Sequence, residues 1–124
     1  MPLHKGLLVV GALLGFIGVA LGAFGAHALK DKMAPHLLNI LEVGVRYQLF
    51  HALLIVVLSG LASVFNPQWM AGAGWLIVLG VVLFSGSLYL LALTGIKQWG
   101  AVTPVGGLTL LAGWVCIVVG AWKS

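Results

Sequence analysis

The sequence predicts an all-α membrane protein, a bundle of four transmembrane helices with a short amphipathic segment between the first helix and the second. Hydrophobic residues make up 62% of the 124 residues and charged residues only 6%, and the mean hydropathy is +1.20. Such a chain has too few polar side chains to cover a water-soluble surface. Four apolar stretches, each long enough to cross a bilayer, occupy most of the chain.

The four stretches are predicted to be helices because their backbone groups must be satisfied within each segment, and the alternation typical of barrel strands is missing. Their bounds are Leu7 to Ala26, Tyr47 to Phe65, Ala71 to Leu93 and Thr103 to Trp122. Short connections make consecutive helices antiparallel neighbours. We therefore expect residues 1–124 to form a single four-helix transmembrane domain.

The start of the chain has a competing interpretation as a cleaved signal peptide. Lys5 precedes an apolar run, and Ala26-His27-Ala28 has the small-x-small form of a cleavage site. The apolar run is longer than the core of a signal peptide, and its glycines are regularly spaced. We expect this segment to be the first transmembrane helix.

Glycines are predicted to form the packing faces of the first and last helices, since membrane helices associate through small residues that let backbones approach. In the first helix they fall within roughly 80° of arc. The predicted packing positions are Gly11, Gly15, Gly18, Gly22, Gly25, Gly106, Gly113 and Gly120. The pattern predicts tight packing within one bundle, and homodimerisation through the glycine face is the alternative.

The segment from His27 to Arg46 holds five of the eight charged residues. From Pro35 onward, apolar residues alternate with polar ones in the manner of an amphipathic helix. This segment is expected to lie along the membrane or to continue into the second helix. Thr103 and Pro104 have the pattern of an N-cap and a first helical residue, so the last helix should begin there.

Polar residues inside the spans are the candidates for function, because each costs free energy in hydrocarbon unless it has a partner. His51 lies on the same helix face as Tyr47, with Gln48 beside it, and Ser85, Ser87 and Tyr89 lie on the third helix. These residues predict a polar cluster. It either forms a cavity in which His51 carries a proton or anchors a ligand, or only bonds the helices together, the interpretation we favour.

Catalysis and metal binding have little support in the sequence. No serine lies in a nucleophile elbow, and the first, third and fourth helices contain no carboxylate. His27, His36, His51 and Glu42 lack the close spacing of a metal site. The net charge of +4 is spread over both ends of the helices, which is typical of contact with lipid headgroups and not of nucleic-acid binding. We expect no enzyme activity, no metal, no cofactor and no nucleic acid.

Four segments together resemble the YgdD-like small membrane proteins, the family of domain of unknown function 423. They are residues 22–29 (GAFGAHAL), 47–48 (YQ) with 51–53 (HAL), 84–89 (FSGSLY) and 103–107 (TPVGG) with Gly113-Trp114. The resemblance implies a bacterial multi-pass protein of four helices without an established biochemical activity. It also implies that the family's motif positions include His27, Tyr47, Gln48, His51, Ser85, Ser87, Tyr89 and Thr103.

The sequence gives two conflicting indications of the membrane orientation. Lys30, Lys32, Arg46 and Lys97 lie on one side and Lys5 and Lys123 on the side of the termini, so the positive-inside rule favours termini outside. The family resemblance implies termini inside, which is the orientation we adopt. We expect a protein of the bacterial cytoplasmic membrane.

The expected role is structural, or one in membrane integrity, through contacts with membrane lipids or a partner protein, with a homo-oligomer as a further possibility. The alternative is a transporter or small-molecule binder that uses the polar cluster around His51.

Overall fold

The computed structural model describes residues 2–124, with side chains from His4 onward. Four helical units in this part are long and apolar enough to cross a membrane. They span His4–Leu29, Pro35–Leu61, Pro67–Thr94 and Lys97–Trp122. The prediction of an all-α protein with four transmembrane helices is confirmed.

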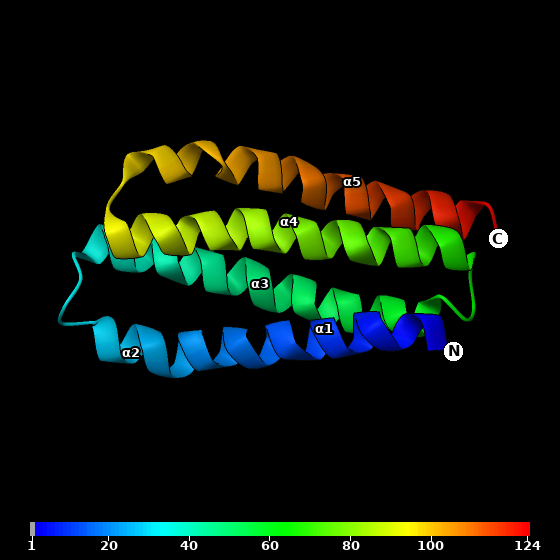
Figure 1. Cartoon of the computed structure of the whole chain (residues 1–124), viewed down its shortest axis with the longest axis horizontal. Helices are drawn as coiled ribbons and strands as arrows, with labels where there is room; N and C mark the ends of the chain where they lie inside the picture. The colour runs from blue at the N-terminus through cyan, green and yellow to red at the C-terminus, as the bar shows by residue number, and fades with distance from the viewer. Residues whose placement is uncertain (1) are drawn as a thin grey trace.

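The first unit is longer than predicted and contains a π-helical turn. It consists of α1 (Pro2–Ala20), the π-helix η1 (Leu21–Gly25) and α2 (Ala26–Leu29). A π turn holds one more residue than an α turn, so it rotates the residues that follow around the helix axis. The chain nevertheless runs on in one direction through α1 and α2 (Figure 1).

The amphipathic segment is the first part of the second transmembrane helix. A single helix, α3, runs from Pro35 to Leu61, so the segment continues into the membrane span and does not form a separate helix along the surface. Pro35 occupies the first turn, where its missing N–H costs nothing, and no further proline interrupts the helix. The predicted end at Phe65 was wrong, because residues 62–65 form a turn.

The third helix begins earlier than predicted. α4 runs from Pro67 to Thr94, and the Asn66 side chain accepts hydrogen bonds from the backbone nitrogens of Gln68 and Trp69, at 3.1 and 3.3 Å. Asn66 is thus an N-cap. Gly95 ends the helix in the left-handed conformation with φ of 71°, which glycine adopts without a steric cost.

The last helix, α5, spans Thr103–Trp122 and confirms the predicted bounds. A 3₁₀ helix, η2 (Lys97–Ala101), precedes it. The predicted capping role of Thr103 was wrong. Val102 occupies the cap position, no side chain caps the helix, and the Thr103 hydroxyl lies 2.6 Å from the Ser87 hydroxyl oxygen on α4.

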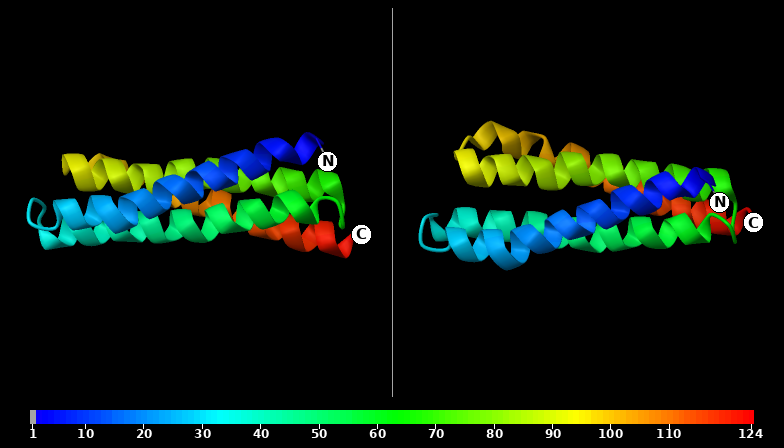
Figure 2. Two further views of the ribbon diagram at one scale, coloured as in Figure 1. Left: turned by 90° about the horizontal axis from the view of Figure 1, so that it is seen from below. Right: turned by 60° about the horizontal axis from the view of Figure 1, so that its bottom comes forward.

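Helices α3 and α4 form the centre of the molecule, with α1 packed mainly on α3 and α5 on α4 (Figures 1 and 2). Both termini lie at the same end (Figure 1). One core cluster contains Leu7, Ile55, Ile77, Val81 and Leu110. The outer faces are apolar, as lipid contact requires, and 74% of the Phe16 surface is exposed.

The glycine face of α1 lies against α3 of the same chain. A Cβ added at each of these glycines would meet a side chain of α3: Ile55 at Gly11, Ala52 at Gly15, Leu49 at Gly18 and Val45 at Gly22. A Cβ at Gly18 would lie 2.7 Å from Cδ2 of Leu49, closer than carbon atoms approach. Gly25 is the last residue of the π-helical turn. A Cβ there would meet only Leu21 and Ala20 of its own helical unit.

The glycines of α5 lie against α4. A Cβ at Gly106 would collide with the backbone nitrogen of Phe84, one at Gly113 with the Ile77 side chain, and one at Gly120 would lie 2.7 Å from Cβ of Trp69. The backbones of α4 and α5 therefore approach most closely at Gly106.

Candidate functional site

The predicted polar residues separate into a buried cluster and an open groove. The buried polar cluster consists of Gln48, Ser85 and Tyr89, where α1, α3 and α4 meet. Gln48 is 3% exposed. Its Nε2 donates to the backbone oxygen of Leu14 at 2.7 Å, and its Oε1 accepts from the Tyr89 hydroxyl at 2.6 Å. One side chain thus links three helices.

Ser85 completes the buried polar cluster. Its hydroxyl donates to the backbone oxygen of Gly44 on α3 at 2.7 Å. Gly44 is needed there, because a Cβ would lie 2.7 Å from Cε1 of the Tyr89 ring. Since each of these buried groups has a partner, the cluster stabilises the packing of α1, α3 and α4 and offers no free polar group to a ligand.

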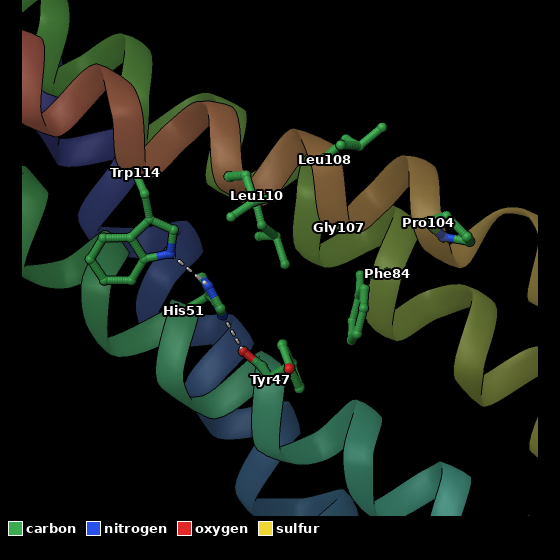
Figure 3. A pocket seen from close by; sticks show the side chains of 9 residues that line it. Tyr47, His51, Phe84, Pro104, Gly107, Leu108, Leu110 and Trp114 are labelled. Atoms are coloured by element: carbon green, nitrogen blue, oxygen red, sulfur yellow. Dashed lines mark hydrogen bonds between the residues drawn. The ribbon is translucent and has the colours of Figure 1, made fainter.

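His51 uses both of its ring nitrogens. Nδ1 lies 2.7 Å from the backbone oxygen of Tyr47, and Nε2 lies 3.2 Å from the indole nitrogen of Trp114 on α5 (Figure 3). A carbonyl only accepts and an indole N–H only donates, so the proton is on Nδ1 and Nε2 accepts. His51 is therefore a neutral bridge between α3 and α5, and a further ligand on either nitrogen would have to break a bond.

A groove of about 580 Å³ lies beside this bridge, between α3 and α5. We call it the α3–α5 groove. Its lining residues are Tyr47, His51, Phe84, Pro104, Gly107, Leu108, Leu110, Leu111 and Trp114 (Figure 3). This volume is in the usual range of ligand pockets, roughly 300–1,000 Å³. The rings of Tyr47 and Phe84 are tilted by 36° with their centres 4.4 Å apart, so two contacting aromatic side chains form one side.

A second cavity, of about 430 Å³, continues along the same face. It shares Tyr47, His51 and Trp114 with the α3–α5 groove and adds Phe50 and Arg46. Arg46 is exposed. The combined surface is apolar over most of its length, and Arg46 supplies the only charge among the residues that line the two cavities.

The remaining predicted positions lie outside the groove. Ser87 donates to the backbone oxygen of Phe84 and contacts Thr103, so this pair holds the start of α5 against α4. His27 is exposed on α2 and belongs to neither the buried cluster nor the groove. In the described part of the chain, no three histidine, cysteine, aspartate or glutamate residues lie together as a metal site would require.

Sequence reasoning missed Arg46, Phe84 and Trp114 as groove residues. Phe84 and Trp114 lie within the motif segments, which was the available signal. They line one groove only because α3 and α5 both pack on α4. The spacing of residues along a single helix gives no information on which helices are neighbours.

Four apolar helices, internally bonded polar side chains and an apolar outer surface define a multi-pass membrane protein. The model of the family described as protein of unknown function (DUF423) matches residues 21–107. The chain belongs to this family, as the sequence resemblance predicted.

Curated relatives cover almost the whole chain. The UPF0382 membrane protein SH2409 of Staphylococcus haemolyticus is 46% identical over 96% of this chain and 97% of its own length. The UPF0382 membrane protein YwdK of Bacillus subtilis is 44% identical, over 96% and 98%. The UPF0382 inner membrane protein YgdD of Escherichia coli is 46% identical, over 93% and 88%. No solved structure matches.

Proposed function

We propose that this protein is a non-enzymatic lipid-binding protein of the bacterial cytoplasmic membrane, which holds one phospholipid in the α3–α5 groove and has a structural or membrane-integrity role. The observation that carries the proposal is an apolar groove of about 580 Å³ on the outer face of a membrane-spanning helix pair.

The surroundings of the groove support an acyl chain as its occupant. Leu108, Leu111 and Trp114 line it and are also exposed on the outer surface, so the groove opens to the medium around the helices. Over most of a membrane span this medium is hydrocarbon. A hydrocarbon chain fills an apolar groove without a desolvation cost and gains close contacts with its walls.

Arg46 supports the orientation of the bound lipid. It lines the second cavity, one helical turn before Phe50 on α3. An arginine in a membrane helix is costly unless it reaches a polar partner, and a guanidinium binds phosphate through several N–H groups. The phospholipid is therefore oriented with its phosphate at Arg46 and an acyl chain along Phe84 and Leu111.

The chemistry of the lining supports a binding role over catalysis. The nine residues of the α3–α5 groove include no carboxylate, thiol or amine. Both ring nitrogens of His51 are already in hydrogen bonds. The Tyr47 hydroxyl is the only hydroxyl among the lining residues, and it has no free general base beside it.

The test is native mass spectrometry of the protein released from its membrane in dodecyl maltoside, comparing the wild type with Gly107→Leu and Gly86→Leu. Gly107 lines the groove, and a Cβ there would meet only the Phe84 ring, at 3.9 Å. A Cβ at Gly86 would meet nothing within 4 Å. Leucine at 107 fills the groove, whereas leucine at 86 is a control for added bulk.

We expect one phospholipid on the wild type and on Gly86→Leu, and none on Gly107→Leu at a melting temperature close to that of the wild type. A lipid-free wild type, or lipid retained by Gly107→Leu, would contradict the proposal. A stoichiometric non-lipid adduct lost in His51→Gln would support a small-molecule binder or transporter instead, and a lipid-free oligomer would favour a partner chain.

A further inference from the structure

The opposite end of the molecule holds a buried polar atom without a partner. His4, near the start of α1, is only 4% exposed. Its Nδ1 is the one buried side-chain nitrogen or oxygen in the described part of the chain that forms no hydrogen bond. A buried polar atom without a partner costs free energy, so a partner at this position would stabilise the protein.

His4 lines a cavity of about 320 Å³, which we call the His4 cavity. The other lining residues are Lys5, Leu8, Ser59, Gly60 and Ser63, from α1 and the end of α3. The cavity is far larger than one water molecule, which occupies about 30 Å³ in the liquid. It therefore has room for a chemical group of a larger molecule.

The hydrogen-bonding groups of the cavity select for an anion. The hydroxyls of Ser59 and Ser63 already donate to the backbone oxygens of Val56 and Gly60, at 2.6 and 2.7 Å. The donors left for a ligand are the Lys5 ammonium group and an N–H of the His4 ring. A cation beside a second donor is the arrangement that binds a negatively charged oxygen acceptor.

The position of the cavity identifies the source of that anion. At the same end of the molecule the Lys123 ammonium lies 5.1 Å from the centre of the Trp69 ring, and Trp122 is exposed. Tryptophan and lysine at helix ends mark the headgroup region of a bilayer. Leu8 continues the cavity wall toward the hydrocarbon side.

We propose that the His4 cavity binds the phosphate group of a phospholipid, with a ring N–H of His4 and the Lys5 ammonium as its donors. This site is separate from the α3–α5 groove, because neither cavity of the groove shares a lining residue with it. It lies at the end of the bundle that holds both chain termini (Figure 1), whereas Arg46 is near the middle of α3.

The experiment measures ¹⁵N–³¹P dipolar dephasing by solid-state NMR. Protein carrying ¹⁵N in its histidine rings is placed in dioleoylphosphatidylglycerol vesicles in a phosphate-free buffer. The His4 signal is assigned by its loss in His4→Gln. We expect ³¹P to dephase the signal of a His4 ring nitrogen, because a phosphate that accepts its N–H lies next to it.

Two pairs of variants separate the site from general lipid contact. Gly60 lines the cavity and Gly72 lies on α4 outside it, and a Cβ at either would meet nothing within 4 Å. Gly60→Leu fills the cavity and should abolish the His4 dephasing, whereas Gly72→Leu should retain it. Lys5→Gln should weaken it, and Lys30→Gln, at the other end, should leave it unchanged.

Absence of dephasing in the wild type would overturn the proposal, because the cavity would then hold water only. Equal dephasing in Gly60→Leu would also overturn it. Dephasing in dodecyl maltoside with inorganic phosphate but not in vesicles would identify a free-phosphate site and exclude the lipid. None of these results depends on Gly107→Leu, so the His4 cavity and the groove can fail separately.

Discussion

The two sides of α3 differ in how its neighbours are held. Toward α1 and α4 the backbones approach closely, with glycines opposite large side chains and Gln48 bonded to two neighbours. Toward α5 the same helix has one side-chain hydrogen bond, from Trp114 to His51, beside an open groove. Because burial of apolar surface does not drive helices together in lipid, small residues and polar bonds determine which gaps close.

The largest expected effect is at the closest backbone approach. Gly106→Ala places a Cβ against the backbone nitrogen of Phe84, which cannot move without shifting α4. We expect the free energy of unfolding to fall by about 3 kcal/mol, the upper end of the usual cost of overpacking. Unfolding in dodecyl sulfate, followed by circular dichroism, measures it. Gly86→Ala is the control, and an equal stability of the two variants would contradict the close approach.

Breaking the buried polar cluster should have the next largest effect. Gln48→Leu leaves the Tyr89 hydroxyl without its acceptor and removes the bond to Leu14. We expect a loss of about 1–2 kcal/mol, since a buried group without a partner costs more than the net value of one membrane hydrogen bond. The same unfolding assay applies. Gln68→Leu, at an exposed position, should be neutral, and a neutral Gln48→Leu would show that the cluster does not stabilise the fold.

The glycine face of α1 should respond more mildly. In Gly18→Ala the new Cβ meets the end of the Leu49 side chain, which can shift, so we expect a loss of about 1 kcal/mol. Gly25→Ala should be neutral or slightly stabilising, because its Cβ meets only its own helical unit and alanine favours helix. Thermal melting in detergent compares them. A larger loss in Gly25→Ala would place the packing face elsewhere or indicate a contact between chains.

The smallest effect on stability should come from the bridge across the groove. Trp114→Phe keeps an aromatic ring but removes the donor to His51 Nε2, and we expect about 0.5 kcal/mol, typical of one hydrogen bond between membrane helices. The sharper readout is ¹⁵N NMR of the His51 ring. The Nε2 resonance should shift while Nδ1 keeps its proton, and an unchanged Nε2 resonance would mean that the bridge is absent.

Local patterns predicted much of this fold. Length and hydropathy gave the four spans, because a helix that crosses the bilayer must be apolar along its own sequence. Gly11, Gly18, Gly106 and Gly113 could be placed on packing faces from their periodicity. The family motif segments contain every member of the buried polar cluster and most of the residues that line the groove.

The rest depended on which helices lie side by side. The π turn at Leu21–Gly25 rotates Gly25 off the packing face, and no residue in the sequence marks that turn. His51 and Trp114 are 63 positions apart, and their bond exists only because α3 and α5 both pack on α4. His4 is buried although it lies near the chain start, and the end of α3 lines the same cavity.

The most direct test of the account is a set of nuclear Overhauser contacts between lipid chains and methyl groups. Protein with protonated leucine and isoleucine methyls in a deuterated background is reconstituted with protonated phospholipid. Leu110 lines the groove yet is only 4% exposed, so lipids passing over the surface do not reach it. Ile55 is fully buried outside the groove. The account predicts contacts from an acyl chain to Leu110 and none to Ile55, and their absence at Leu110 would contradict a lipid in the α3–α5 groove.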